Sequence, residues 1–287
     1  MIKLIASDID GTLLTDQGIM SPQTHRAIHQ AIAEGIEFLP VTGRGYAAAQ
    51  NIIGMQGLQL PMINLNGALV SSAQGQALSQ LPLPQNQVLA MRDFLDQADV
   101  RYSLVSQDCY YTTDPDRYQA GIIRFLKDQT ASHQQAGIPT PSIELDQAKA
   151  FIQDIGRLKD LPQQDFLKLI FFTDQEDLRQ SFREYFAGNE LLTLSSSGRH
   201  NVEITQAKAS KGQALTKYLE EAGYQKDEVL SIGDSYNDLS MFAVTGHSYA
   251  MGNAEPAVQA QANALAPSNQ EDGAAWMIQE VLAGRIG

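Results

Sequence analysis

Cysteine is almost absent from this chain of 287 residues, in which Cys109 stands alone. A single cysteine cannot form a disulfide bond within the chain, so this is not a small secreted domain held together by disulfides. Because unpaired thiols are typical of a reducing compartment, we expect the protein to be cytoplasmic.

Long apolar runs are missing as well. No stretch approaches the roughly 18 apolar residues that a membrane-spanning helix requires. The apolar run at residues 2–6 is followed at once by Asp8 and Asp10, and it is too short for the hydrophobic region of a signal peptide. These absences predict a soluble protein with no membrane partner.

Basic residues are few, with 20 Lys and Arg against 33 Asp and Glu, which gives a net charge of −13. A surface this acidic repels the phosphates of nucleic acids, so we expect no nucleic-acid partner. It would also repel a small anionic substrate, unless a metal ion or a group of basic side chains reverses the charge locally. Hydrophobic residues make up 43% of the chain, as in ordinary globular proteins.

Strand and helix patterns alternate over the first part of the chain. Residues 2–6, 36–41 and 62–65 are mostly apolar, as in strands that are buried on both faces. Between the first two lies a helical pattern that begins at Ser21 and ends at Gly35. This alternation predicts a doubly wound, Rossmann-like parallel sheet, in which ligands bind at the carboxyl ends of the strands.

The pattern changes after Pro82 and Pro84. The following stretch mixes helices and strands without strict alternation, which indicates an inserted α+β domain. From about residue 200 the alternation returns. We therefore expect a catalytic core of residues 1–82 and 200–287, with an inserted domain of residues 83–199.

Two carboxylates follow the first predicted strand in the sequence Asp8-Ile9-Asp10-Gly11-Thr12. If the chain turns here, both carboxylates share one site, where one can attack a phosphorus atom while the other transfers protons. The same residues are also those of an ordinary solvated turn, so the motif alone leaves both interpretations open.

Two shorter motifs are weak signals when each is taken alone. Thr42, Gly43 and Arg44 follow the second strand, where a hydroxyl and backbone N–H groups can hold phosphate oxygens. Lys211 begins a predicted helix, where it could neutralise a phosphoryl group, although Lys208 lies close enough to compete for this role.

A fourth motif spans residues 233–238, after another buried strand. Asp234 is a hard oxygen ligand of the kind that Mg²⁺ prefers. Asn237 and Asp238 lie at the start of the next helix, where they either cap the helix or face the site.

The four motifs, in this order, resemble those of the haloacid dehalogenase-like hydrolases, and more narrowly the Cof-like members of subclass IIB with a type-two cap. The resemblance covers residues 1–82 and 200–287, and the insertion lies where that family has its cap domain. Further family-like stretches are residues 66–68, 203–204, 250–254 and 272–273.

The resemblance implies a role for each carboxylate. Asp8 would be the nucleophile that forms an aspartyl phosphate, and Asp10 would be the general acid and then the general base. Mg²⁺ would be held by Asp8, by the backbone carbonyl of Asp10 and by Asp234. For Asp10 to be protonated at neutral pH, we expect a nearby carboxylate to raise its pKa.

The resemblance also implies a phosphate-binding set. Its members would be the Ile9 backbone, Thr42, Gly43, Lys211 and Asn237. Asp238 would orient Lys211 from behind, and Lys211 would share in catalysis. Beyond this set, Arg44 and Arg199 are candidate contacts to the substrate or the cap, and Trp276 is expected in the core.

These expectations add up to a Mg²⁺-dependent phosphoric monoester hydrolase. Its substrate would be a small phosphorylated metabolite, such as a sugar phosphate, a nucleotide or a phosphorylated cofactor. Two alternatives stay open. A phosphomutase of the same superfamily would pass the phosphoryl group to another hydroxyl, and a non-catalytic sensor would bind a phosphometabolite without turnover.

Overall fold

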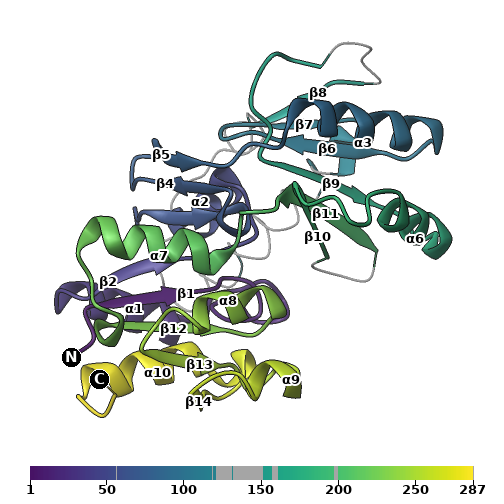
Figure 1. Ribbon diagram of the computed structural model, residues 1–287. Coiled ribbons are helices and arrows are strands. Elements are labelled where there is room, and N and C mark those ends of the chain that lie inside the picture. The colour runs from purple at the N-terminus through teal and green to yellow at the C-terminus, as the bar shows by residue number, and fades with distance from the viewer. Residues whose placement is uncertain are drawn as a thin grey trace.

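The computed structural model describes residues 1–55, 57–117, 119–120, 131, 151–156, 161–196 and 200–286. In these residues, parallel strands form a central sheet in the order β14-β13-β12-β1-β2 (Figure 1). Their bounds are Leu4–Ser7 (β1), Glu37–Pro40 (β2), Val229–Gly233 (β12), His247–Ala250 (β13) and Ala264–Leu265 (β14). Since the strands are parallel, all their carboxyl ends lie at one edge of the sheet.

Helices cover both faces of this sheet, which explains why its central strands β1 and β12 are mostly apolar. On β1, Ile5 packs against one layer of helices, while Leu4 and Ala6 pack against the other. The first layer contains α1 (Pro22–Ala33), α2 (Tyr46–Met55) and α10 (Gly273–Leu282). The second contains α7 (Lys211–Ala222), α8 (Leu239–Phe242) and α9 (Pro256–Gln259). The predicted doubly wound core is confirmed.

A small antiparallel sheet extends the core beyond β2. It contains β3 (Met62–Asn64), β4 (Leu69–Ser71) and β5 (Ala77–Gln80). A parallel bridge between Val41 and Ile63 attaches it to the central sheet. Short 3-10 helices complete the described core: η1 (Leu65–Gly67), η2 (Lys226–Glu228), η3 (Tyr236–Asp238) and η4 (Asn269–Glu271).

The inserted segment forms a second, mostly antiparallel sheet in the order β10-β11-β9-β6-β7-β8. The strands are β6 (Tyr102–Val105), β7 (Tyr110–Thr112), β8 (Ile152–Asp154), β9 (Lys168–Phe172), β10 (Leu192–Ser195) and β11 (Asn201–Gln206). Helices α3 (Gln85–Gln97) and α6 (Glu176–Tyr185) pack on one face. This layer structure confirms the predicted α+β insertion.

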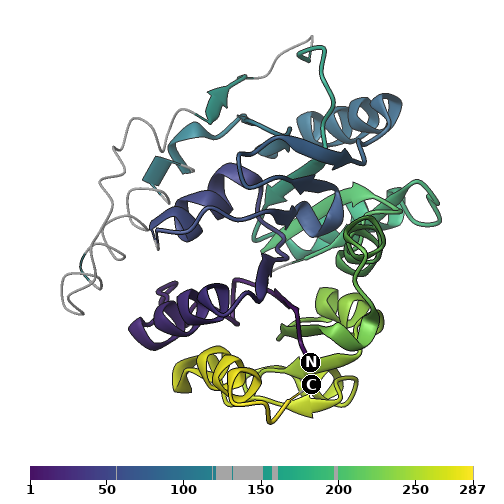
Figure 2. The same ribbon diagram turned by 90° about the vertical axis from the view of Figure 1, so that its left-hand side faces the viewer.

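The other face of the inserted sheet looks toward the carboxyl edge of the central sheet. Along β9, Leu169 and Phe171 pack in the hydrophobic core with α3 and α6. The alternate residues Lys168, Ile170 and Phe172 line a cavity together with core residues. Figure 2 shows the two sheets one above the other, with both termini on the core.

Strand β11 lies within the range that the sequence assigned to the core, yet it pairs with β9 and β10 of the inserted sheet. We propose that the cap extends over residues 83–206, because a strand belongs with the sheet that satisfies its hydrogen bonds. Among the described residues, no helix has both the length and the apolar character needed to cross a bilayer.

Candidate active site

Two acidic side chains lie at the ends of neighbouring central strands. Asp8 directly follows β1 and Asp234 directly follows β12, and these strands pair in parallel along their length. The N–H of Asp8 donates to the carbonyl of Ile232 at 3.0 Å, which extends the strand pairing to the end of β1. The matching register therefore brings both carboxylates to the same edge of the sheet.

Lys211 lies buried between two carboxylates. Its Nζ is 2.8 Å from Oδ1 of Asp8 and 2.6 Å from Oδ1 of Asp238. Lys211 is 1% exposed, Asp8 5% and Asp238 0%, so water does not screen these contacts. Burial alone would lower the pKa of Lys211, but the charges of Asp238 and Asp8 outweigh it and raise the pKa.

Asp238 is fixed from the other side by the backbone. Its Oδ2 accepts hydrogen bonds from the N–H groups of Asp234 and Ser235, both at 2.9 Å. Lys211 in turn is the first residue of α7, which is capped by the side chain of Ser210. The N-terminal capping of α7 by Ser210 thus fixes the position of Lys211. The backbone hydrogen bonds of the turn after β12 hold Asp238 beside it.

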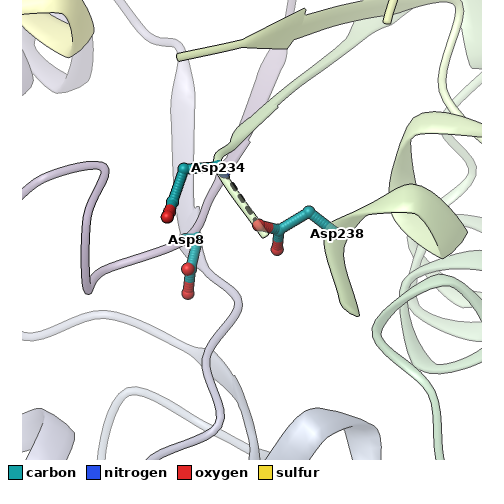
Figure 3. A group of neighbouring side chains, drawn as sticks. All are labelled: Asp8, Asp234 and Asp238. Carbon is teal, nitrogen blue, oxygen red and sulfur yellow. Dashed lines mark hydrogen bonds between the residues drawn. The ribbon is translucent and has the colours of Figure 1, made fainter. Parts of the chain in front are cut away.

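The carboxylates of Asp8, Asp234 and Asp238 have oxygens within 4.8 Å of one another. Figure 3 shows Asp8 and Asp234 beside each other, while Asp238 reaches toward the backbone of Asp234. Burial raises the pKa of Asp8 well above its usual value, and Lys211 offsets this only in part. Burial, followed by the charge of Asp238, raises the pKa of Asp234 to about 6.

This donor set suits a hard divalent cation. Thr12 and Ser235 each donate a hydrogen bond to Asp234 at 3.0 Å, which fixes the orientation of its carboxylate. Asp8 and Asp234 line the cavity, whereas Asp238 is fully buried and engaged with Lys211 and with backbone N–H groups, so Asp8 and Asp234 are the better ligands. Mg²⁺ commonly takes one or two carboxylates together with water, and two carboxylates are available here.

Of the candidate phosphate-binding residues, Gly43, Lys211 and Asn237 line the same cavity as Asp8 and Asp234, whereas Thr42 is fully buried and is not part of its lining. Thr42 and Gly43 follow β2, and the N–H of Arg44 donates to Oγ1 of Thr42 at 3.1 Å. Asn237 donates to Oδ1 of Asn66 at 3.1 Å across the site. The side chain of Ile9 is fully buried in the core, so only its backbone is placed to face a ligand.

Asp10 forms a bidentate ion pair with Arg44. The distances are 2.7 Å from Nε and 2.6 Å from an Nη of Arg44 to the two carboxylate oxygens. Burial would raise the pKa of Asp10, but the hydrogen bonds and charge of Arg44 outweigh it and lower the pKa. The expected raised pKa is therefore wrong for this arrangement, because the nearest charged group is a guanidinium and not a carboxylate.

A cavity of about 1020 Å³ lies between the carboxyl edge of the core and the inserted sheet. Among the described residues, the cations that line it are Arg44, Lys168 and Lys211. Four carboxylates line the same cavity, those of Asp8, Asp10, Glu203 and Asp234, so these three cations do not by themselves reverse the negative charge of the site. An anionic substrate therefore needs a further cation there.

The family profile of the haloacid dehalogenase-like hydrolases matches residues 5–278. The chain is a haloacid dehalogenase-like hydrolase. It is 29% identical over 289 residues to the 5-amino-6-(5-phospho-D-ribitylamino)uracil phosphatase YwtE of Bacillus subtilis strain 168, with 99% of both chains covered. It is 28% identical to the pyridoxal phosphate phosphatase YbhA of Escherichia coli K12, covering 96% of this chain and 97% of that one.

A solved haloacid dehalogenase-like hydrolase from B. subtilis superposes on this hydrolase with a TM-score of 0.80 at 27% identity. The match covers 98% of this chain and 100% of the other. The predicted family and the predicted hydrolase class are thereby confirmed.

Two residues at the site of this hydrolase received no site role from the sequence, although Glu203 lies in the family-like stretch of residues 203–204. Lys168 and Glu203 line the cavity from the cap, and each is 4% exposed. A charged residue at an inward position of an otherwise apolar strand, as in Lys168-Leu-Ile-Phe-Phe, was the available signal. Arg199, which was predicted as a contact to the substrate or the cap, lies outside the described residues.

Proposed function

We propose that this hydrolase is a Mg²⁺-dependent phosphatase of a small phosphorylated metabolite, acting through an aspartyl phosphate on Asp8. The observation that carries the proposal is the buried contact of Lys211 with both Asp8 and Asp238. A carboxylate at the floor of a cavity, held by a buried lysine, has the position and the charge environment of a nucleophile for phosphorus.

In the first half-reaction an oxygen of Asp8 attacks phosphorus, and the bond from phosphorus to the ester oxygen breaks. Lys211 offsets part of the negative charge that gathers between Asp8 and the transferring group. Thr42, the N–H groups of Gly43 and Ile9, and Asn237 hold the phosphoryl oxygens. The product is an acyl phosphate on Asp8 together with an alcohol.

The leaving oxygen needs a proton, and in this proposal Asp10 gives it. Asp10 must leave its pair with Arg44 and become protonated before this transfer. A bound phosphoryl group provides that opportunity, because it offers Arg44 another anion.

In the second half-reaction Asp10 takes a proton from water, whose oxygen attacks phosphorus. The bond from phosphorus to Asp8 breaks, which returns the carboxylate and releases inorganic phosphate. The inserted domain lies over the cavity and limits the access of bulk water to the site during the first half-reaction.

Asp8, Asp234 and the backbone carbonyl of Asp10 are the proposed ligands of Mg²⁺. When bound, the ion supplies positive charge that offsets the repulsion between a carboxylate and a phosphoryl dianion. The raised pKa values of Asp8 and Asp234 are consistent with a site that has an excess of negative charge without a cation.

For the substrate, we adopt only the broad chemical class that the named relatives share. The two phosphatases named above act on chemically different compounds although they are almost equally similar to this chain. We therefore propose a small phosphorylated metabolite and leave the leaving group to experiment.

Release of phosphate from p-nitrophenyl phosphate and from a panel of sugar phosphates, nucleotides and phosphorylated cofactors tests the proposal. We expect release that requires Mg²⁺ and is lost in Asp8→Asn. Transfer of the phosphoryl group to a second sugar hydroxyl without net release would instead identify a phosphomutase. Binding of Mg²⁺ and phosphometabolites with no turnover would identify a sensor.

A further inference from the structure

Lys168 and Glu203 form an ion pair inside the cap. A contribution to the stability of the cap does not explain why this pair is buried. Lys168 Nζ lies 2.6 Å from Oε2 of Glu203, and both side chains are about 5% exposed. The other carboxylate oxygen of Glu203 accepts from Nδ2 of Asn201 at 3.0 Å. Burying two charges costs solvation energy that their attraction seldom repays, so such a pair is weak evidence of a stabilising role.

The pair also contacts the core. Lys168 Nζ also donates to the backbone carbonyl of Gly43 at 3.0 Å. This contact joins strand β9 of the cap to the loop after β2, across 125 positions of sequence. The same ammonium group therefore links a cap carboxylate to the candidate phosphate-binding loop.

The bond to Gly43 fixes one particular peptide unit. The carbonyl of Gly43 and the N–H of Arg44 belong to the same planar group, and that N–H donates to Oγ1 of Thr42 at 3.1 Å. With both ends of the peptide held, its rotation is blocked, and Oγ1 of Thr42 is held beside it. Lys168 thus acts on the geometry of the loop without needing to touch a substrate.

A second contact from the cap holds the same loop. The N–H of Gly45 donates to the hydroxyl of Tyr110 on β7 at 3.1 Å. A Cβ at position 45 would lie 2.8 Å from that hydroxyl oxygen, so this approach requires glycine. The cap therefore holds the loop of residues 42–45 by two hydrogen bonds, one to Gly43 and one to Gly45, on either side of Arg44.

We propose that Lys168, held by Glu203, is a positioning residue that shapes the phosphate-binding loop when the cap is docked. This inference rests on the proposed phosphatase function. Docking of the cap and assembly of the phosphate site are then one event, since the cap supplies a donor that the loop lacks when the cap is away.

Lys168→Met tests the proposal, because it keeps the length of the side chain and removes the charge and the donors. The readouts are kcat and KM for p-nitrophenyl phosphate and the inhibition constant of inorganic phosphate, which probes the loop directly. We expect the inhibition constant and KM to rise about tenfold, with kcat changed less than threefold, as for lost uniform binding. Lys168→Arg, which keeps a donor and a charge, should recover part of the affinity.

Lys3→Met is the matched control, because Lys3 pairs with Glu228 on the surface at the opposite end of β1. It should leave all three constants unchanged. Tyr110→Phe removes the second hydrogen bond between the cap and the loop without removing a charge, and it should raise the inhibition constant two- to fivefold. If Lys168→Met does not fold, Tyr110→Phe still tests the proposal.

The inference is overturned if folded Lys168→Met and Tyr110→Phe bind inorganic phosphate within twofold of the wild type. Loss of thermal stability alone, with phosphate affinity retained, would make Lys168 a structural residue of the cap and would also overturn it. Absence of phosphatase activity in the wild-type protein would instead refute the proposed function, so the two failures are distinguishable.

Discussion

Lys211 is buried away from water, and its charge stabilises the ionised forms of two buried carboxylates. Asp8 and Asp238 are both within 2.8 Å of Nζ, and none of the three is more than 5% exposed. Lys211 therefore offsets part of the cost of burying both carboxylates, and backbone N–H groups also stabilise Asp238. Removing the lysine leaves Asp8 and Asp238 without their shared counter-charge.

Lys211→Met is expected to lose both turnover and stability. We expect kcat to fall about 10³-fold, and the free energy of unfolding to fall by about 3–5 kcal/mol at pH 7.5. Steady-state kinetics and urea unfolding measure the two effects. Lys217→Met is the control, because Lys217 is exposed and lies 3.8 Å from Glu221. Its unfolding free energy should change by less than about 1 kcal/mol. Wild-type stability in Lys211→Met would contradict the argument.

Substitutions at Asp10 and Asp234 distinguish the proposed acid–base role from the proposed metal-binding role. Asp10→Asn removes the proton donor but keeps the backbone carbonyl that is the proposed ligand, so turnover should fall at least 10³-fold while the Kd for Mg²⁺ stays within threefold. Asp234→Asn should weaken Mg²⁺ binding at least tenfold, because it loses a carboxylate ligand. Isothermal titration calorimetry and kinetics on both variants check this. Near-normal turnover in Asp10→Asn would exclude the acid–base role.

At the scale of elements, the packing of α7 against α8 keeps Lys211 in place. The N–H of Gly212 donates to Oγ of Ser240 at 3.0 Å, and a Cβ at position 212 would lie 2.0 Å from the backbone oxygen of Ser240. The two helices approach so closely only because residue 212 has no side chain.

Gly212→Ala is therefore expected to push α7 away from α8. We expect a loss of about 1–3 kcal/mol in the free energy of unfolding, as for overpacked cores, and a lower kcat because Lys211 is the adjacent residue. Gly54→Ala is the control within a helix. A Cβ there meets only the end of the flexible Gln50 side chain at 3.1 Å, so stability should be unchanged or slightly higher. Equal effects of the two substitutions would contradict the close-packing argument.

The central strands and the helices were predictable from sequence because burial on both faces makes them apolar. The expected strand at residues 36–41 is β2 (Glu37–Pro40), and the expected helix between Ser21 and Gly35 is α1 (Pro22–Ala33). Strand β5 was missed because its four residues are exposed or half-buried, which leaves no alternating pattern to detect. Strand β8 was missed for the same reason.

Side-chain partners were less predictable than the backbone. The motifs place the acids at strand ends, but they do not reveal that Arg44 pairs with Asp10, since that contact depends on how two loops face each other. Trp276, which was expected in the core, is 40% exposed. Its neighbours Ala274, Met277 and Ile278 occupy the buried face of α10, and residue 276 falls outside that face.

At the scale of the whole molecule, the net charge of the protein is −13. The site becomes positive, and so opposite in charge to the surface, only when a divalent cation is bound. The metal-free protein holds Asp8, Asp234 and Asp238 close together, and Lys211 alone faces two of them. Binding of a divalent ion should therefore stabilise the entire fold, because the folded state alone presents the ligands.

That stabilisation should depend on pH through both proposed ligands, since the pKa of Asp8 is also raised well above its usual value. The pKa of Asp234 is raised from 3.8 to about 6 in the fold, so the folded state binds this proton more tightly than the unfolded chain does. The stability that the proton contributes is present in full below pH 3.8 and is lost as the pH rises through about 6. Mg²⁺ competes with the proton for the same carboxylate, so it replaces the lost stability above pH 6 and gains little below it.

We therefore expect 10 mM Mg²⁺ to raise the melting temperature several degrees more at pH 7.5 than at pH 5.0. Differential scanning fluorimetry at both pH values, with NaCl at matched ionic strength, measures this difference. In Asp234→Asn the increment should be small at both pH values, because one of the two carboxylate ligands is gone. An equal increment at pH 5.0 and 7.5 in the wild type would show that Mg²⁺ stabilises the protein elsewhere, and the assignment of Asp234 as a metal ligand would fail.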